Sequence, residues 1–250
     1  MIPGTTVSLI AGALYVLCGL GFAVWFQRTT GRARTYCAAA MVFIGAAAMV
    51  FIGLGAVSHL LSGLEIGTLS VAGGLIDLPS LTEDLITYTG VFVLVGLLAG
   101  ASKQLLAALA GTMLFVRLVF ELPNSGLVDG TGALLSAGIV IAGYLVIVML
   151  FLRPIWAAAQ QVAPRQRLLH WKCRNLVLFL FGVLLVYAIL AVTGLFDPFV
   201  LAVLNAHIDF LIRVGTAALL FANMDELHET DIDRTNPASP AAGGAESYVQ

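Results

Sequence analysis

The sequence predicts an all-α integral membrane protein whose seven transmembrane helices form one bundle. Three observations lead to this prediction. First, 60% of the 250 residues are hydrophobic and only 10% are charged, whereas soluble domains usually carry about 25% charged residues. Second, segments of roughly 20 apolar residues, the length that crosses a bilayer, occur seven times along the chain. Third, the basic residues are concentrated in alternate connections between these segments.

The seven predicted spans follow one another with mostly short connections, so we expect consecutive helices to be antiparallel neighbours. They are residues 6–26, 36–57, 81–101, 104–122, 133–152, 173–193 and 199–223. The first span lacks a basic leading region and a small-residue cleavage site, which predicts a retained helix rather than a signal peptide. The bundle is expected to occupy residues 1–224, followed by a disordered, acidic cytoplasmic tail at residues 225–250.

The connection at residues 56–80 is longer than the others. Its stretch "GTLSVAGGLIDL" alternates loosely in hydropathy, which predicts a small β-hairpin. The third span, which follows it, contains Gly96 and Gly100. This small-xxx-small pair permits the close approach of a neighbouring helix.

Charge placement predicts the orientation of the chain in the cell membrane. The lysines and arginines of the odd-numbered connections and the tail are Arg28, Arg32, Arg34, Lys103, Arg153, Arg165, Arg167, Lys172, Arg174 and Arg234. The second, fourth and sixth connections contain no lysine or arginine, and carry Glu65, Asp77, Asp129 and Asp197. Because cytoplasmic loops carry the excess of lysine and arginine, the N-terminus is predicted to lie outside and the C-terminus in the cytoplasm.

The last span contains an acid and a base within the apolar stretch "HIDFLIRVGTAALLF". Asn205, Asp209, Arg213 and Thr216 fall on one face of the predicted helix, and ionisable residues in a membrane usually face the bundle interior. The Asp209–Arg213 pair has two interpretations, an ion or proton site and a buried ion pair that neutralises itself. We favour the ion pair. It predicts that Asp209→Asn destabilises the protein more than Arg213→Met, because an unpaired guanidinium cannot lose its proton.

Two further groups of charged residues lie within predicted spans. Glu83 and Asp84 either reach Arg213 from the third span or cap that helix at the outer surface, where acids are favourable. We interpret Asp84 as a cap and leave the role of Glu83 open. Arg117 and Glu121, four residues apart in the fourth span, are interpreted as a local pair whose arginine extends to the outer surface.

The remaining polar residues argue against several classes of function. His59 and His207 are isolated, with no second ligand at a metal-binding spacing, so no metal site is predicted. The sequence has no Gly-rich phosphate loop and no nucleophile beside a base, which argues against an enzyme. The three cysteines, Cys18, Cys37 and Cys173, are an odd number that suits reduced thiols. A formal charge of −2 gives no indication of nucleic-acid binding, and the predicted partner is the lipid bilayer.

In the order and spacing of these elements the chain resembles the microbial rhodopsins, above all the haloarchaeal branch of bacteriorhodopsin and halorhodopsin. In that family the seventh helix carries Asp-x-x-x-Lys followed by Val-Gly, and the lysine holds retinal as a Schiff base. The matching stretch here runs from Asp209 through Arg213 to Gly215. The sixth helix of the family often opens with Arg-Asn, as at Arg174–Asn175, and "GLLAG" at residues 96–100 looks like halorhodopsin-type pumps.

The chain departs from the family at the chromophore. Arg213 replaces the attachment lysine, and a Schiff base needs a neutral amine, whereas a guanidinium is effectively always protonated. The only lysines are Lys103 and Lys172, both at predicted cytoplasmic helix ends. The family holds retinal between tryptophans of the third and sixth helices. The resemblance places Phe181 at the sixth-helix tryptophan and Leu184–Leu185 at a Tyr-Pro pair.

The third span departs from the pumps as well. Counting back from "GLLAG" places Ser80 at the arginine of the family, Glu83 at the proton acceptor, Asp84 at the tryptophan and Leu94 at the cytoplasmic proton donor. The register can slip by a residue or more, because residues 88–90 lack the proline that would anchor it. In any nearby register the proton path is incomplete.

These departures imply an opsin-related protein without covalent retinal. We expect a non-pumping interaction, regulatory or sensory subunit, with a former chromophore pocket at Tyr88, Phe181, Leu184 and Leu185. One alternative is a photoreceptor or transporter that binds retinal, or another carotenoid-derived ligand, without a covalent bond. Another is a passive ion pathway along the polar stripe. The expected partners are further copies, since opsins of this family often form trimers, or another membrane or signalling protein.

Overall fold

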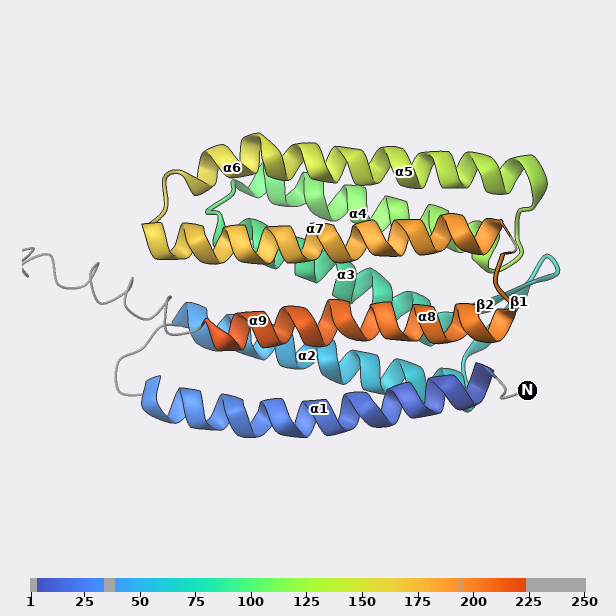
Figure 1. Cartoon of the computed structure of the whole chain (residues 1–250), viewed down its shortest axis with the longest axis horizontal. Helices are drawn as coiled ribbons and strands as arrows, with labels where there is room; N and C mark the ends of the chain where they lie inside the picture. The colour runs from blue at the N-terminus through green and yellow to red at the C-terminus, as the bar shows by residue number, and fades with distance from the viewer. Residues whose placement is uncertain (1–3, 34–38, 194, 224–250) are drawn as a thin grey trace, which may run out of the picture.

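The computed structural model describes residues 4–33, 39–193 and 195–223, in which seven membrane-length spans lie side by side (Figure 1). The first four helices are α1 (Gly4–Ala33), α2 (Ala39–Gly63), α3 (Leu78–Leu98) and α4 (Lys103–Asn124). They are followed by α5 (Gly130–Leu152) with the short α6 (Pro154–Ala159), by α7 (Pro164–Val192), and by a last span made of α8 (Pro198–Phe210), the π-helical segment η1 (Leu211–Gly215) and α9 (Thr216–Ala222). The predicted seven-helix membrane bundle is confirmed, and the chain is a multi-pass integral membrane protein. The predicted tail and Cys37 lie outside the described residues.

The two ends of the bundle differ in structure. One end carries the start of α1 and the strands β1 (Thr68–Val71) and β2 (Gly74–Asp77), and the other carries α6 and the start of α7 (Figure 1). We call these the hairpin end and the α6 end. The predicted β-hairpin is confirmed, with Leu69 opposite Ile76. Its two turn residues, Ala72 and Gly73, have φ angles of 50° and 86°, as a two-residue type I′ turn requires.

The hairpin is attached to the loop between α4 and α5. The backbone N–H of Leu75 donates a hydrogen bond to the carbonyl of Ser125 at 2.9 Å. Gly74 permits this approach, because a Cβ atom at that position would lie 2.5 Å from the same oxygen. The hairpin therefore connects the start of α3 to the α4–α5 loop.

A capping residue and a proline mark two helix starts that hydropathy placed too late. The helix α3 begins at Leu78 because the side chain of Asp77 accepts a hydrogen bond from the N–H of Ser80 at 3.2 Å. The helix α7 begins at Pro164, nine residues before the predicted start, and proline is favourable in the first helical turn. As a consequence, the basic residues between 165 and 174 belong to a helix rather than to a loop.

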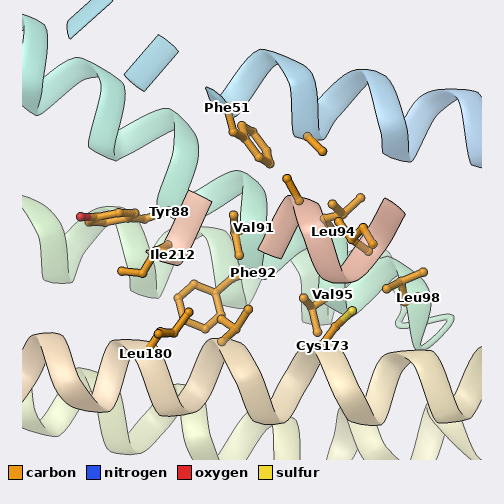
Figure 2. Close-up of a cluster of buried hydrophobic side chains, with 14 of the residues drawn as sticks. Phe51, Tyr88, Val91, Phe92, Leu94, Val95, Leu98, Cys173, Leu180 and Ile212 are labelled. Atoms are coloured by element: carbon orange, nitrogen blue, oxygen red, sulfur yellow. The ribbon is translucent and has the colours of Figure 1, made fainter. Parts of the chain in front are cut away.

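The half of the bundle nearer the α6 end is filled mainly by apolar side chains. Figure 2 shows part of this cluster, which joins α3, α7 and the last span. Its buried members include Val91, Leu94, Val95, Leu98, Cys173, Leu180 and Ile212. We call these seven residues the apolar block. Leu94, which the resemblance places at the proton-donor position, lies inside it.

Candidate functional site

Arg213 is the centre of a buried network of ion pairs. Its side chain lies in the half of the bundle nearer the hairpin end and is almost fully buried, with 1% of its surface exposed. The Nε atom donates to Oε1 of Glu83 at 2.6 Å, and Nη2 donates to the second oxygen of the same carboxylate. Nη2 also donates to Oδ1 of Asp84 at 2.6 Å. The last span is thus joined to α3 by a two-pronged charged contact, the strongest kind of hydrogen-bonded ion pair.

Asp209 is a weaker partner of Arg213 than the sequence suggested. Its Oδ1 atom lies 3.4 Å from Nη1 of Arg213. The same carboxylate accepts hydrogen bonds from the hydroxyl of Tyr88 and from the amide of Asn205, the latter at 3.2 Å. The predicted buried ion pair between Asp209 and Arg213 is therefore present, but Arg213 is also paired with Glu83 and Asp84, so the two residues do not neutralise each other alone. The π-helical segment that contains Arg213 adds a residue to the helical turn, which shifts its side chain relative to Asp209.

A second arginine extends the network to α4. Arg117 donates from Nε to Oδ2 of Asp84 at 2.9 Å and from Nη1 to Oε2 of Glu121 at 2.7 Å. All three side chains are buried. The local Arg117–Glu121 pair is confirmed, but the arginine does not extend to the surface. Asp84 is not the cap of α3 either, since Asp77 has that role.

Among the residues that the structure describes, the network contains more acids than bases. Its charged members are the guanidinium groups of Arg117 and Arg213 and the carboxyl groups of Glu83, Asp84, Glu121 and Asp209. Two cations therefore face four acids, in a region where an unpaired charge is costly. Neutral hydroxyl groups also belong to the network. Thr87 donates to Glu83 at 2.7 Å, and the hydroxyl of Tyr15 lies 3.5 Å from Nη1 of Arg213.

Some members of this network could have been found in the sequence, and others not. Glu83 and Thr87 are four residues apart on one face of α3, a pattern that periodicity reveals. Tyr15, by contrast, comes from α1 and has no charged neighbour in the sequence. The polar stripe predicted on the last span is also only partly connected to the network. Thr216 is buried, and its hydroxyl has no hydrogen-bond partner among the described residues.

A cavity of about 200 Å³ lies beside the network, between α3, α4, α5, α7 and α8. All four residues of the expected chromophore pocket line it, namely Tyr88, Phe181, Leu184 and Leu185. Asp84, Arg117 and Asn205 form a polar part of its wall, whereas Arg213 is not among its lining residues. The rest of the wall includes the aromatic side chains of Phe92, Phe120, Tyr144 and Tyr187. The cavity wall thus combines polar and apolar side chains.

The two histidines that the sequence analysis singled out, His59 and His207, lie in different surroundings. His59 contacts the carbonyl of Gly55 through Nδ1 at 3.1 Å and packs its ring against Tyr15, with 5.2 Å between ring centres. His207 is exposed on α8. Among the described residues, no three histidine, cysteine or acidic side chains are grouped so that they could hold a metal ion.

The fold is that of solved microbial rhodopsins. A cyanorhodopsin from the cyanobacterium Calothrix superposes with a TM-score of 0.77 at 15% identity, covering 92% of this chain and 99% of that one. The thermophilic rhodopsin of Rubrobacter xylanophilus superposes with a TM-score of 0.75 at 17% identity, covering 91% of this chain and 99% of that one. A light-driven proton pump from Leptosphaeria maculans superposes with a TM-score of 0.77 at 14% identity, covering 92% of this chain and 98% of that one. No protein-family model and no curated protein matches the sequence. At these identities the likeness establishes the fold.

Proposed function

We propose that this membrane protein is opsin-related, holds no covalent retinal, pumps no ions, and acts as an interaction, regulatory or sensory subunit in the cell membrane. The haloarchaeal affinity and a homotrimeric or heteromeric assembly belong to the same proposal. The observation that carries it is the position of Arg213. The residue that replaces the attachment lysine is buried and bonded to Glu83 and Asp84.

The lysines of the chain support this proposal. A guanidinium cannot form the Schiff base that a neutral amine forms. Lys103 begins α4 at the α6 end, and Lys172 donates a hydrogen bond to Asn223 at 2.7 Å beside the end of α9. Both positions lie far along their helices from the cavity. No other lysine exists in the sequence.

The apolar block supports the absence of pumping. A proton that crosses a membrane protein needs a succession of ionisable or hydrogen-bonding groups. The cavity extends along α3 from Ser80 to Phe92. Beyond it, Val95, Leu98 and other apolar side chains fill most of the bundle towards the α6 end (Figure 2), where the buried His170 has its Nδ1 atom 2.9 Å from the carbonyl oxygen of Val95. This arrangement favours a non-pumping role over an ion pathway.

The absorption spectrum of the protein purified from its native membrane tests the proposal. We expect no visible band and no response to hydroxylamine, which cleaves retinal Schiff bases. Vesicles that contain the protein are expected to show no light-driven change of pH. The variant Arg213→Lys provides an amine, and is expected to remain without pumping because Leu94 and the apolar block are unchanged. A band that bleaches with hydroxylamine, or pumping by this variant, would contradict the proposal.

The cavity favours a second candidate function, the non-covalent binding of retinal or another carotenoid-derived ligand. Its volume of about 200 Å³ exceeds the roughly 150 Å³ of an apolar cavity that binds benzene. Titration with all-trans-retinol, followed by energy transfer from the tryptophans, tests this function. Leu184→Trp fills the cavity and is expected to abolish saturable binding. Val186→Trp, on the exposed side of the same helix, is the matched control and is expected to bind as the parent does.

A further inference from the structure

Three arginines follow the contact between α6 and the first three turns of α7. The guanidinium of Arg174 lies over the ring of Trp156 in α6, with 4.8 Å from its central carbon to the ring centre. One turn further along, the side-chain oxygen of Gln160 accepts a hydrogen bond from Nη1 of Arg167 at 3.2 Å. Arg167 and Arg174 are seven residues apart, so they share one face of α7. The third, Arg153, immediately precedes α6. We call these three arginines the arginine seam.

Arg174 is a buried cation without an acidic partner among the described residues. Only 8% of its surface is exposed, and its Nε and Nη2 atoms donate to a single neutral oxygen, Oδ1 of Asn175, at 3.1 and 2.9 Å. A guanidinium has five N–H donors, so Arg174 keeps donors for a further partner. The acids in the described part of the chain lie away from the α6 end, at Glu65, Asp77, Glu83, Asp84, Glu121, Asp129, Asp197 and Asp209. Since a buried charge without a counterion is costly, the seam favours an anionic partner from outside the bundle.

The seam lies at the depth of the lipid headgroups. The helix α5 has 23 residues, from Gly130 to Leu152, and at 1.5 Å per residue it is about 34 Å long. The hydrocarbon core of a bilayer is roughly 30 Å thick. Arg153 follows this helix directly, and Trp156 belongs to α6, which lies at the end of the bundle (Figure 1). Tryptophan is also a residue type that membrane interfaces favour. The guanidinium over Trp156 is therefore positioned among headgroups rather than among acyl chains.

We infer that the arginine seam is a binding site for the phosphate of an anionic phospholipid from the leaflet at the α6 end. Phosphate oxygens accept two parallel N–H bonds from a planar guanidinium, and such charge-assisted pairs are stronger than neutral ones. In this arrangement Arg174 holds the phosphate, and Arg153 and Arg167 provide positive charge on either side of it. Exposed basic groups attract anionic lipids without fixing them, whereas the buried Arg174 gives one headgroup a defined position. This inference is independent of ligand binding in the cavity.

The acidic segment of the chain that begins at Asp225 is the other candidate partner. Lys172 precedes Arg174 by two residues, so the two side chains point about 200° apart around α7. Lys172 donates a hydrogen bond to Asn223 at 2.7 Å, beside the end of α9. The chain after residue 223 therefore starts on the opposite side of α7 from the seam. This placement and the headgroup depth both favour a lipid.

Fluorescence quenching of Trp156 by brominated lipids tests the site. The chain has three tryptophans, so Trp25→Phe combined with Trp171→Phe leaves Trp156 as the reporter. The protein is placed in phosphatidylcholine bilayers with increasing fractions of brominated phosphatidylglycerol, or of brominated phosphatidylcholine as the neutral reference. At about 0.5 M salt, exposed charges are screened beyond a few ångström, whereas buried pairs are screened much less. We expect phosphatidylglycerol to be preferred at least ten-fold over phosphatidylcholine under these conditions.

Two substitutions remove one positive charge each from the same end of the bundle. Arg174→Gln is expected to lower the preference at least five-fold, whereas Lys103→Gln, at the exposed start of α4, is expected to leave it within two-fold. Unchanged quenching by brominated phosphatidylcholine shows that each variant keeps Trp156 in the same lipid environment. If Arg174→Gln does not assemble, Arg153→Gln, at an exposed position, provides the same test with an expected loss of at least three-fold.

The remaining outcomes assign the seam to another partner or to none. A parent protein without lipid preference, or equal losses in Arg174→Gln and Lys103→Gln, would overturn the inference. Loss of the preference in excess inorganic phosphate would overturn it in favour of a soluble anion. A preference that appears only after removal of the residues from Asp225 onward would assign the seam to the acidic segment, and would overturn the lipid site as well.

Discussion

Arg213 makes its shortest contacts to α3, although its nearest acid in the sequence is Asp209. The two parallel bonds to Glu83 match the planar guanidinium to a carboxylate, a geometry that a lysine ammonium cannot reproduce. Asp209 is satisfied mainly by Tyr88 and Asn205. The two members of the sequence pair therefore serve different partners, and their loss is expected to have different costs.

Arg213→Met is expected to lower the free energy of unfolding by about 3–5 kcal/mol, because Glu83 loses its cation inside the bundle. Asp209→Asn keeps a carbonyl oxygen that can accept from Tyr88, so we expect a loss of about 1–2 kcal/mol. This order is the reverse of the one predicted from the sequence alone. Unfolding of the two variants in mild detergent measures it. A greater loss for Asp209→Asn would mean that the i, i+4 pair dominates after all.

Arg117→Leu provides a second test at the scale of a single residue. The sequence interpretation, an arginine extended to the surface, predicts a small effect. Its buried bonds to Asp84 and Glu121 predict a loss of about 3–5 kcal/mol instead. Arg153→Leu is the control, because Arg153 is exposed and surface substitutions usually stay within about 0.5 kcal/mol. Equal effects of the two substitutions would argue that the Arg117 contacts contribute nothing.

The polar stripe of the last span could be predicted because periodicity assigns residues to faces of one helix. The partners of those residues could not. The Arg117–Asp84 contact joins positions 33 apart, and the Arg213–Glu83 contact joins positions 130 apart. Such pairs depend on the rotation and register of two helices, which the pattern within each helix leaves undetermined. For this reason the sequence left the role of Glu83 open, although Glu83 is the main partner of Arg213.

At the scale of elements, the last span illustrates what hydropathy misses. A single helix over residues 199–223 was expected, and the structure divides it into α8, η1 and α9. A π-helical turn is intrinsically less favourable than an α-helical one and persists where tertiary contacts stabilise it. Here the contacts of Arg213 with α3 provide that stabilisation. Propensity scales contain no information on these contacts.

Deletion of Leu211 tests the role of the π-helical segment. Removing one residue restores regular helical spacing, which turns Arg213 away from α3. We expect a loss of unfolding free energy at least as large as the roughly 3–5 kcal/mol of Arg213→Met. Leu211→Ala is the control, because this side chain is 39% exposed and its truncation alone is expected to cost less than about 1 kcal/mol. Comparable losses in the deletion and in Leu211→Ala would show that the extra residue has no role.

At the scale of the whole molecule, the fold was predictable because composition and loop charge act on every span at once. The same reasoning placed the starts of α3 and α7 too late in the sequence. A window that counts apolar residues ignores polar first turns, and Asp77 and Pro164 mark the true boundaries. The cavity was not predictable in size, because its volume depends on how five helices pack.

Truncation separates the bundle from the tail. Removing all residues from Asp231 onward is expected to change the free energy of unfolding by less than about 0.5 kcal/mol, since the removed segment is polar and contains Pro and Gly. Truncation after Gly215 removes α9 and its buried Ala217, Leu220 and Phe221. We expect that chain to fail to assemble in the membrane. Size-exclusion profiles and unfolding curves of the two truncated proteins would show the contrast, and failure of the shorter deletion would mean that the tail packs on the bundle.

The distance in sequence between Glu83 and Arg213 also has a consequence for biosynthesis. A ribosome adds roughly 5–20 residues per second, so the 130 intervening positions take roughly 7 to 26 seconds. By the end of that interval Glu83, Asp84 and Glu121 are translated and have Arg117 as their cation within the network. The second cation of the network, Arg213, is therefore made only with the last span. A ribosome that stalls before residue 213 therefore leaves three acids with one cation among these four positions, an arrangement that is costly inside a bilayer.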